Sequence, residues 1–412
     1  MMKKGYLLSI VMPTKNRQKY AVKAINQILS IANNNIELIV QDNSDDSTLK
    51  NEIINNVIDK DKRFIYNYNN KELSFVDNFS EAISFATGEY ICVIGDDDGI
   101  LPSIIPITEW AKTNNIDAII PKTNAVYIWP SQNPIVDNGE NGYLCMSYIN
   151  EKVDRCEPKK ALEEVMSYGG QKYLYTDLVK LYHGVVKRDC MNKVKNITGS
   201  YFGGLSPDIY ASFALSIIVE NAIKINYPLT ISGICSTSGS SDSATGKHTG
   251  RLEDAPHFRG HSSYDWSEEV PKFYSVETIW ADSGLQALKE LNATEYINKF
   301  NIAALDMYCE EKYPAFNDLI LEHEKKNNIK RYNIIYEKIR LPYYDFGVKV
   351  VKRMTRKKKD VIKQYNISDI LIAEQKINQK LDELNINIST VLSNLDYLIE
   401  NTSYGEKNDK CS

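Results

Sequence analysis

Three consecutive aspartates, Asp96 to Asp98, stand directly behind the apolar run YICVI (90–94) and just ahead of Pro102. So many carboxylates at the end of a buried segment need a counter-charge, because burying an unpaired charge is costly. Carboxylate oxygens suit Mg²⁺ or Mn²⁺, and phosphate oxygens of a substrate often complete the coordination of these metals. We therefore interpret the cluster as a metal bridge to a diphosphate. An Asp-rich turn, or a cap on the helix that opens at Pro102, is the structural alternative.

Further polar residues follow two other apolar runs near the N-terminus. The stretch PTKNR begins with Pro13 and Thr14, and the stretch QDNSDDS contains Asp42. If these runs are parallel strands, their carboxyl ends place the three residues at the same edge of a sheet as the aspartates. The chain contains neither G-x-G-x-x-G after a strand nor G-x-x-x-x-G-K-[ST], the two glycine-rich cradles for phosphate. A metal is the remaining way to hold a diphosphate against so acidic a rim.

The elements that position these residues alternate between strand and helix over the first 125 residues. Short, β-branched runs of strand length cover 6–12, 36–40, 64–68, 90–94 and 117–121. Between them, apolar residues recur at helical spacing over 20–32, 51–58, 75–86 and 103–113. This alternation predicts an α/β fold with a doubly wound, mainly parallel sheet.

The chain beyond this alternation is first irregular and then helical. Residues 126–200 are expected to elaborate one end of the sheet, and 206–222 to form a helix that begins at Ser206 and Pro207. The Gly-, Ser- and His-rich stretch 231–266 predicts a long mobile loop. A basic helix is expected over 348–364. The positions after it follow a heptad pattern in which nine of ten residues are apolar: Ile367, Ile370, Glu374, Ile377, Leu381, Leu384, Ile388, Val391, Leu395 and Leu398.

Composition and charge exclude some classes of protein. With 412 residues the chain has room for more than one core, and its formal net charge of −5 argues against a nucleic-acid partner. The seven cysteines show no metal-ligand spacing and indicate reduced thiols in a cytoplasmic protein. No apolar window approaches the length of a spanning helix. Pro13, Lys15 and Arg17 interrupt the N-terminal apolar run too early for an export signal.

Three segments carry a resemblance to a known family. SIVMPTKNR, IELIVQDNSDDST and ATGEYICVIGDDDGILP resemble, in this order and spacing, the inverting family 2 glycosyltransferases of GT-A fold. The resemblance is strong over residues 7–125 and weaker as far as residue 240. It implies a nucleoside-diphosphate sugar as the donor, with Pro13 and Thr14 lining the nucleoside pocket and Asp42 bonded to the base.

The same resemblance assigns the metal. In the D-x-D motif of the family, the second aspartate binds the metal. Alignment on the following ILP places Gly95 at the first aspartate and Asp97 at the second, so this chain departs from the usual pattern. The resemblance therefore implies that Asp97 binds Mn²⁺ or Mg²⁺. Asp96 or Asp98 contacts the ribose or shares the metal, and the sequence does not divide these roles between them.

Inverting transfer also needs a general base opposite the leaving diphosphate. Members of the family carry this base, often as Glu-Asp, at the start of a helix well after the metal motif. Here the matching stretch GGLSPDIYASFAL supplies Asp208, with Pro207 in place of the glutamate. An acidic residue in the first turn also stabilises any helix through its macrodipole, which is the structural alternative.

Other features leave alternatives open. His257 and His261 reach the metal or the diphosphate when the loop closes, or they are ordinary solvated loop residues. The processive members of the family carry a Q-x-x-R-W motif beside membrane spans; neither occurs here, which favours transfer of a single sugar to a glycan or lipid-linked acceptor. The basic run 349–359 rests on an anionic leaflet or is simply solvated. The heptad seam over 367–399 joins copies of the chain, the favoured interpretation, or packs on its own domain.

The domain plan and function follow from these expectations. A GT-A domain is expected over 1–240, with a nucleotide-sugar half (1–125) and an acceptor half (126–240). After it come the mobile loop 241–266, a helical region 267–347, the basic helix and coiled coil 348–400, and a flexible tail 401–412. We expect a metal-dependent enzyme of surface polysaccharide or lipopolysaccharide assembly, cytoplasmic or peripheral on the cytoplasmic face of the membrane. Two alternatives stay open: a sugar nucleotidyltransferase, against which the glycine-free PTKNR loop argues, and a non-catalytic coiled-coil assembly protein with a vestigial nucleotide site.

Overall fold

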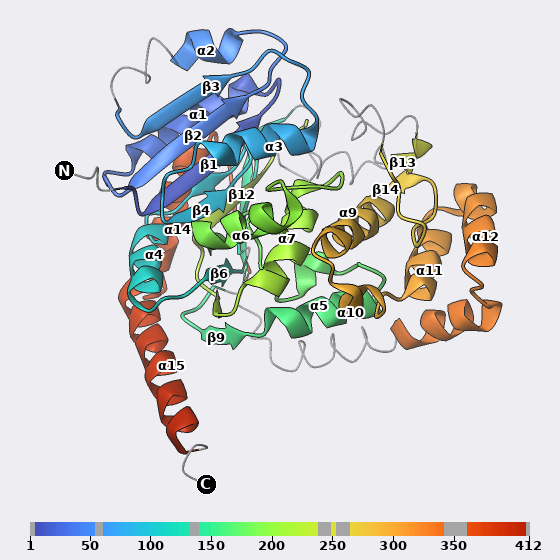
Figure 1. Cartoon of the computed structure of the whole chain (residues 1–412). Coiled ribbons are helices and arrows are strands. Elements are labelled where there is room, and N and C mark those ends of the chain that lie inside the picture. Colours follow the sequence, from blue (N-terminus) through green and yellow to red (C-terminus); the bar gives the residue numbers. More distant parts are fainter. Residues whose placement is uncertain are drawn as a thin grey trace.

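The structure is a computed structural model of the chain (Figure 1). It describes residues 5–53, 61–122, 124–131, 140–147, 149–237, 249–252, 264–341 and 361–408, with side chains as far as Asn401. His257, His261 and the basic run 349–359 lie outside these described residues.

An eight-stranded sheet forms the centre of the molecule. Its first four strands run parallel in the order β3-β2-β1-β4 and span Phe64–Tyr68, Ile36–Asp42, Leu8–Thr14 and Tyr90–Val93. The sheet continues with β10 (Val185–Lys187), β6 (Ala118–Pro121), β11 (Ala222–Ile225) and β9 (Val153–Cys156). Of these, β10 is antiparallel to both of its neighbours and β9 is an antiparallel edge strand. The predicted α/β fold with a mainly parallel, doubly wound sheet is confirmed.

Helices cover both faces of this sheet, because its strands are apolar on both sides. Along β1, Leu8, Ile10 and Met12 pack into one core cluster with α1 (Gln18–Ser30) and α4 (Ile104–Thr113). Val11, which points to the opposite face, packs into a second cluster. That cluster is built with helices α3 (Phe75–Ser84), α5 (Pro158–Ser167), α6 (Arg188–Thr198) and α7 (Pro207–Ile218). The short helix α2 (Thr48–Ile53) packs against α1.

Within the predicted helical region 267–347, the described residues from Val276 onward are mainly helical (Figure 1). The region contains α9 (Val276–Glu290), α10 (Thr294–Ile297), α11 (Ile302–Lys312), the single 3₁₀ turn η5 (Pro314–Phe316), α12 (Asn317–Lys326) and a further helix over 331–341. Helix α9 packs along α7. The region is therefore continuous with the second core cluster and is not a separate appendage.

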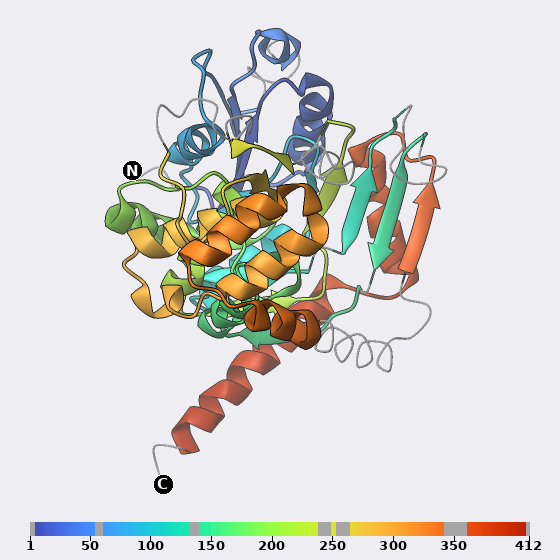
Figure 2. The ribbon, with the colours of Figure 1, turned by 90° about the vertical axis from the view of Figure 1, so that its right-hand side faces the viewer.

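A second sheet of five strands lies beside the first, in the order β15-β8-β7-β12-β5. These strands span Val361–Tyr365, Tyr143–Ser147, Ala125–Ile128, Thr230–Ile234 and Gly99–Ile100. Figure 2 shows the orange-red β15 next to strands from the first half of the chain. Residues 361–364, expected at the end of the basic helix, are thus part of a strand: the antiparallel pairing with β8 satisfies their backbone. A two-stranded ribbon of β13 (Thr249–Gly250) and β14 (Tyr274–Ser275) completes the strands among the described residues.

The heptad seam forms two helices instead of one continuous helix. Helix α14 (Ile370–Glu383) ends before Asn385, whose φ of 53° is left-handed, and α15 (Ile388–Asn408) begins after it. Six apolar seam residues are buried in the first core cluster of this chain: Ile367, Ile370, Ile377, Leu381, Val391 and Leu395. The interpretation that this seam joins copies of the chain is therefore wrong for these six residues, because the domain itself covers them. The end of α15 projects away from the body in both views (Figures 1 and 2).

Helix α14 packs on α1 and on the strand that follows the aspartates. The Gln27 amide donates to the Ile100 carbonyl (2.8 Å) and to the Glu374 carboxylate (2.7 Å). A Cβ at Gly99 would lie 2.9 Å from Cγ1 of Ile370, so these elements touch closely. The C-terminal helix thus helps to fix the position of β5 next to the acidic cluster. Within the described part of the chain, no helix is long and apolar enough to cross a membrane.

Candidate active site

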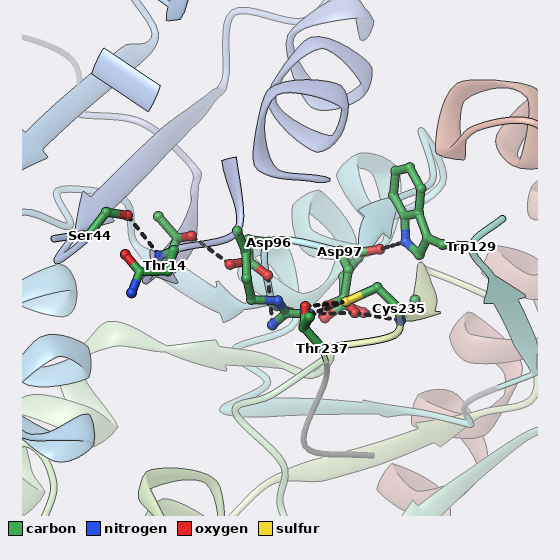
Figure 3. Close-up of polar contacts among 12 residues, drawn as sticks. Thr14, Ser44, Asp96, Asp97, Trp129, Cys235 and Thr237 are labelled. Atoms are coloured by element: carbon green, nitrogen blue, oxygen red, sulfur yellow. Dashed lines mark hydrogen bonds and ion pairs between the residues drawn. The ribbon is translucent and has the colours of Figure 1, made fainter. Parts of the chain in front are cut away.

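The carboxyl ends of β1, β2 and β4 bring the predicted polar residues to one edge of the sheet. The Thr14 hydroxyl donates to Oδ2 of Asp96 over 2.5 Å, across strands that are far apart in sequence (Figure 3). The Asn43 backbone N–H, one residue after β2, donates to the Thr14 carbonyl at 3.0 Å. Parallel alignment of buried strands is sufficient to produce this meeting point.

Arg17, which the sequence analysis did not assign to the site, neutralises part of the acidic cluster. Its guanidinium nitrogens lie 2.8 Å from a carboxylate oxygen of Asp96 and 2.7 Å from one of Asp97. The same group contacts the Cys235 sulfur at 2.8 Å. Arg17 immediately precedes α1, so the turn after β1 carries it to the end of β4. The only signal in the sequence is a basic residue in the loop after the first strand.

Burial governs the protonation of this cluster. Asp96 is 2% exposed and Asp97 is 3% exposed. Burial raises the pKa of Asp96 to about 6, against the opposing charge of Arg17. Burial and the charge of Asp98 raise the pKa of Asp97 to about 7, and Arg17 again opposes the change. Burial alone lowers the pKa of Arg17, but the two aspartates outweigh it and the net shift is upward. The guanidinium therefore limits the rise in the pKa of both carboxylates that burial alone would produce.

Asp98 is held by hydrogen bonds to the protein. It accepts from the Gly95 N–H at 2.6 Å, the Gly233 N–H at 2.7 Å and the Tyr182 hydroxyl at 2.7 Å. It is 1% exposed. These bonds tie the turn after β4 to β12 and to the segment before β10, so Asp98 fixes the local backbone.

Glycine at position 95 has a steric reason. A Cβ there would lie 2.5 Å from the Tyr182 hydroxyl oxygen and 3.0 Å from an oxygen of Asp98. An aspartate at this position, as the resemblance would place it, has no room while Tyr182 holds Asp98. The contact between Tyr182 and Asp98 therefore explains why this chain has glycine where the D-x-D pattern has its first aspartate.

The cluster as arranged does not have the form of a metal site. Its oxygens suit Mg²⁺ or Mn²⁺ by type. However, Asp96 and Asp97 each give an oxygen to Arg17, and both oxygens of Asp98 accept hydrogen bonds from the protein. Among the described residues, no three His, Cys, Asp or Glu side chains are grouped so that they could hold a metal ion. A metal on Asp97 or Asp98 requires a rearrangement of these contacts, and the assignment stays a prediction.

The residues predicted for the nucleoside pocket are buried in the strands. Pro13 lies in β1 opposite Gln41 of β2. Asp42 is fully buried and accepts from the Ser44 N–H at 2.9 Å and the Tyr66 hydroxyl at 2.7 Å. These two bonds hold the carboxylate in a fixed orientation, and each of its oxygens retains a second lone pair.

Asp208 lies in the first turn of α7, as the sequence predicts. Its carboxylate accepts from the Ser206 hydroxyl at 2.5 Å. The turn that precedes it is anchored by Ser283 of α9, whose hydroxyl accepts from the backbone N–H groups of Leu205 (3.1 Å) and Ser206 (3.0 Å). Burial raises the pKa of Asp208, which favours proton uptake. The helical region 267–341 therefore positions the predicted base, a role that the sequence did not indicate.

Asp77 accepts from the Ser74 hydroxyl at 2.7 Å, and Ser74 caps α3, so this acid belongs to a helix start. Arg251 is exposed and described, but the two loop histidines and Arg259 are outside the described residues.

Part of the chain matches a known family. Residues 9–154 match the sequence model of Glycosyl transferase family 2. The putative colanic acid biosynthesis glycosyl transferase WcaA of Escherichia coli K12 is 36% identical over 107 residues, which cover 26% of this chain and 38% of that protein. An uncharacterized glycosyltransferase of Haemophilus influenzae is 38% identical over 97 residues, covering 23% of this chain and 37% of that protein. The chain spans less than half of the length of these two curated relatives.

Solved structures show a distant likeness. The structure of S. aureus TarS 1–349 in complex with UDP-GlcNAc aligns over 80% of this chain and 79% of that one, with 14% sequence identity and a TM-score of 0.43.

Proposed function

We propose that this chain, whose residues 9–154 match the sequence model of Glycosyl transferase family 2, transfers a single sugar from a nucleoside-diphosphate sugar to a hydroxyl group. The observation that carries the proposal is the meeting of Thr14, Asp96 and Arg17 where the parallel strands end. In sheets of this kind, nucleotides bind at that edge. Pro13, Thr14 and Asp42 are assigned to the nucleoside, with Asp96 and Asp98 on the ribose side.

The transfer itself is an in-line displacement. The acceptor oxygen forms a bond to the anomeric carbon while the bond to the diphosphate breaks, and the configuration inverts. The acceptor hydroxyl loses its proton in this step, and we assign Asp208 to receive it. An aspartate with an upward-shifted pKa is a stronger base than an ordinary carboxylate.

Metal dependence is kept as a separate prediction. The family resemblance assigns Mn²⁺ or Mg²⁺ to Asp97, with Asp98 as a second ligand, whereas in the described contacts Oδ2 of Asp97 is bound by Arg17 and by the Cys235 N–H. When bound, such a metal supplies positive charge to the leaving diphosphate. Whether turnover requires the metal is tested by comparing donor turnover in the presence of Mn²⁺ with turnover in the presence of EDTA.

The deciding experiment is donor hydrolysis on a panel of nucleoside-diphosphate sugars, each with Mn²⁺ or EDTA, read as release of nucleoside diphosphate. One base should support release, and the same nucleoside diphosphate should raise the melting temperature. If no donor is turned over and no nucleoside diphosphate shifts the melting temperature, the proposal is wrong. A sugar nucleotidyltransferase would instead release pyrophosphate from a nucleoside triphosphate. Binding without turnover of any donor would indicate the vestigial site of an assembly protein.

The proposed biological setting is the assembly of surface polysaccharide or lipopolysaccharide, on the cytoplasmic face of the membrane. It rests on the family and on one relative that is named for colanic acid biosynthesis. The acceptor is then a glycan or a lipid-linked glycan.

A described surface supports contact with a membrane. The helix over 331–341 exposes four apolar side chains at helical spacing: Tyr332 (69% exposed), Ile335 (50%), Tyr336 (60%) and Ile339 (68%). Its other face is buried through Ile334 and Leu341. The basic run 349–359 follows closely in the sequence. An apolar stripe next to basic residues is suited to an anionic lipid surface.

Vesicle co-sedimentation tests this contact. The full chain should sediment with vesicles that contain anionic lipid and less with zwitterionic ones. The double substitution Ile335→Asp and Ile339→Asp should abolish sedimentation. Leu321→Asp, which changes an exposed apolar residue of α12, is the matched control and should leave it intact. Equal sedimentation of both variants would show that the apolar stripe does not bind the membrane.

A further inference from the structure

The segment before β10 connects the two halves of the candidate site. The Val179 carbonyl accepts from the Ser212 hydroxyl at 2.5 Å, which ties the segment to α7, the helix that begins beside Asp208. Two residues later, the Leu181 carbonyl accepts from the Val93 N–H at 3.1 Å, at the end of β4. The residue between these anchors therefore lies between the predicted base and the strand that leads to the acidic cluster.

That residue is Lys180, whose positive charge is poorly compensated. Its ammonium nitrogen lies over the Tyr173 ring, 5.1 Å from the ring centroid. Among the described residues it has no ion pair, because Asp177, the one acid whose charge raises its pKa, is already paired with Lys224. Burial lowers the pKa of Lys180 to about 8. A cation held in this way gains more from a bound anion than a solvated lysine does.

Two residues next to Lys180, His183 and Tyr173, relate it to the acidic cluster and to Asp208, respectively. Burial lowers the pKa of His183, the charge of Asp98 opposes this change, and the charge of Lys180 adds to it. Nε2 of His183 lies 3.4 Å from Oδ2 of Asp98. On the other side, burial and then the charge of Asp208 raise the pKa of Tyr173, whose ring lies beneath the ammonium. Lys180 thus shares one neighbour, His183, with the acidic cluster and another, Tyr173, with the base.

We propose that Lys180 binds a phosphate group of a substrate between the acidic cluster and Asp208. Lysine suits this task because its ammonium acts as a point charge with three donors. The inference rests on the proposed function, which supplies two sources of phosphate: the diphosphate of the donor and the phosphate of a lipid-linked acceptor. In the first case Lys180 stabilises the charge that develops on the leaving group. In the second case it positions the acceptor.

Isothermal titration calorimetry on the full chain tests the assignment, with the nucleoside diphosphate selected by the panel above and with inorganic phosphate. The test variant is Lys180→Met. The matched control is Lys195→Met, which removes another lysine that lies over a tyrosine ring, that of Tyr201, on α6. Circular dichroism and the melting temperature establish that both variants are folded.

The two sources of phosphate give different results. If the donor is the source, Lys180→Met weakens nucleoside-diphosphate binding about tenfold to a hundredfold, and Lys195→Met does not. If the acceptor is the source, nucleoside-diphosphate binding is unchanged, but the variant loses the binding of inorganic phosphate to protein saturated with the nucleotide. Unchanged affinity for both probes overturns the inference while the proposed function stands. Phosphate binding that depends on Lys180, in a protein that binds no nucleotide, would retain the phosphate site and reject the proposed function.

Discussion

The two charged centres of the molecule differ in how far their charges are paired within the fold. In the acidic cluster, Asp96 and Asp97 share the Arg17 guanidinium, and Asp98 is held by two backbone N–H groups and a tyrosine. In the segment beside α7, Lys180 and Asp208 have no ion pair with a described residue. The charges of the acidic cluster are thus largely paired within the fold, and the charges of Lys180 and Asp208 are not.

This difference separates structural from chemical roles. Charges that are paired in the interior are costly to disturb, because removal of one partner leaves the other buried and unpaired. Charges without such partners contribute little to folding and retain their capacity for a ligand or a proton. The acidic cluster should therefore affect stability first, whereas Lys180 and Asp208 should affect binding and rate.

Asp208→Asn should give the largest effect. It removes the predicted base with almost no change in volume, and general-base catalysis contributes about 10²- to 10⁴-fold. We expect kcat to fall by that factor, measured as transfer or donor hydrolysis, with an unchanged melting temperature. Asp189→Asn, in the first turn of α6, is the matched control for the effect of an acid on a helix start. If both variants retain the wild-type rate, Asp208 is only a helix-stabilising residue.

Arg17→Met tests the opposite expectation. It leaves the carboxylates of Asp96 and Asp97 buried without their counter-charge, and the free energy of unfolding should fall by about 3–5 kcal/mol in denaturant titrations at pH 8. The loss should be smaller at pH 5, where those carboxylates take up protons. Lys112→Met, which breaks an exposed pair with Glu89, should cost about 1 kcal/mol or less. Equal stability of the two variants would show that the cluster does not depend on Arg17.

The sequence predicted the parts of this arrangement that are local. β3 was predicted with its observed limits, Phe64–Tyr68, and the helix that carries Asp208 was predicted to begin at Ser206, where α7 begins at Pro207. Hydrophobic periodicity and helix-start signals are properties of neighbouring residues, so they can be seen in one chain.

The rest depends on contacts between distant segments. Residues 361–365 form a strand because they meet β8, and no local pattern specifies that partner. The seam of α14 is apolar at heptad spacing whether it faces a second copy or α1, so periodicity did not distinguish these packings. Arg17 was missed because the acids that it pairs with follow a different strand. Lys180 was missed because its nearby acid, Asp177, pairs instead with Lys224 of β11.

Tyr182→Phe should have a moderate effect on stability. It removes one of the three donors to Asp98, and a hydrogen bond to a charged group contributes about 1.5–3 kcal/mol. The free energy of unfolding should fall within that range. Tyr201→Phe removes a bond to the neutral side chain of Asn192 and should cost about 1 kcal/mol. An equal loss in both variants would mean that the bond from Tyr182 to Asp98 is no stronger than a bond to a neutral side chain.

The smallest expected difference between the two centres lies in the pH dependence of the rate. Asp208 must be unprotonated to accept the proton, and burial raises its pKa above the ordinary value of 3.8. Below that raised pKa, kcat/KM should therefore fall about tenfold per pH unit, starting at a higher pH than for a solvated aspartate. Nucleoside-diphosphate affinity, measured by calorimetry at the same pH values, depends on the acidic cluster and not on the base. If kcat/KM declines more steeply than affinity as the pH falls, we assign the additional decline to protonation of Asp208. Identical pH profiles for kcat/KM and affinity would contradict this assignment.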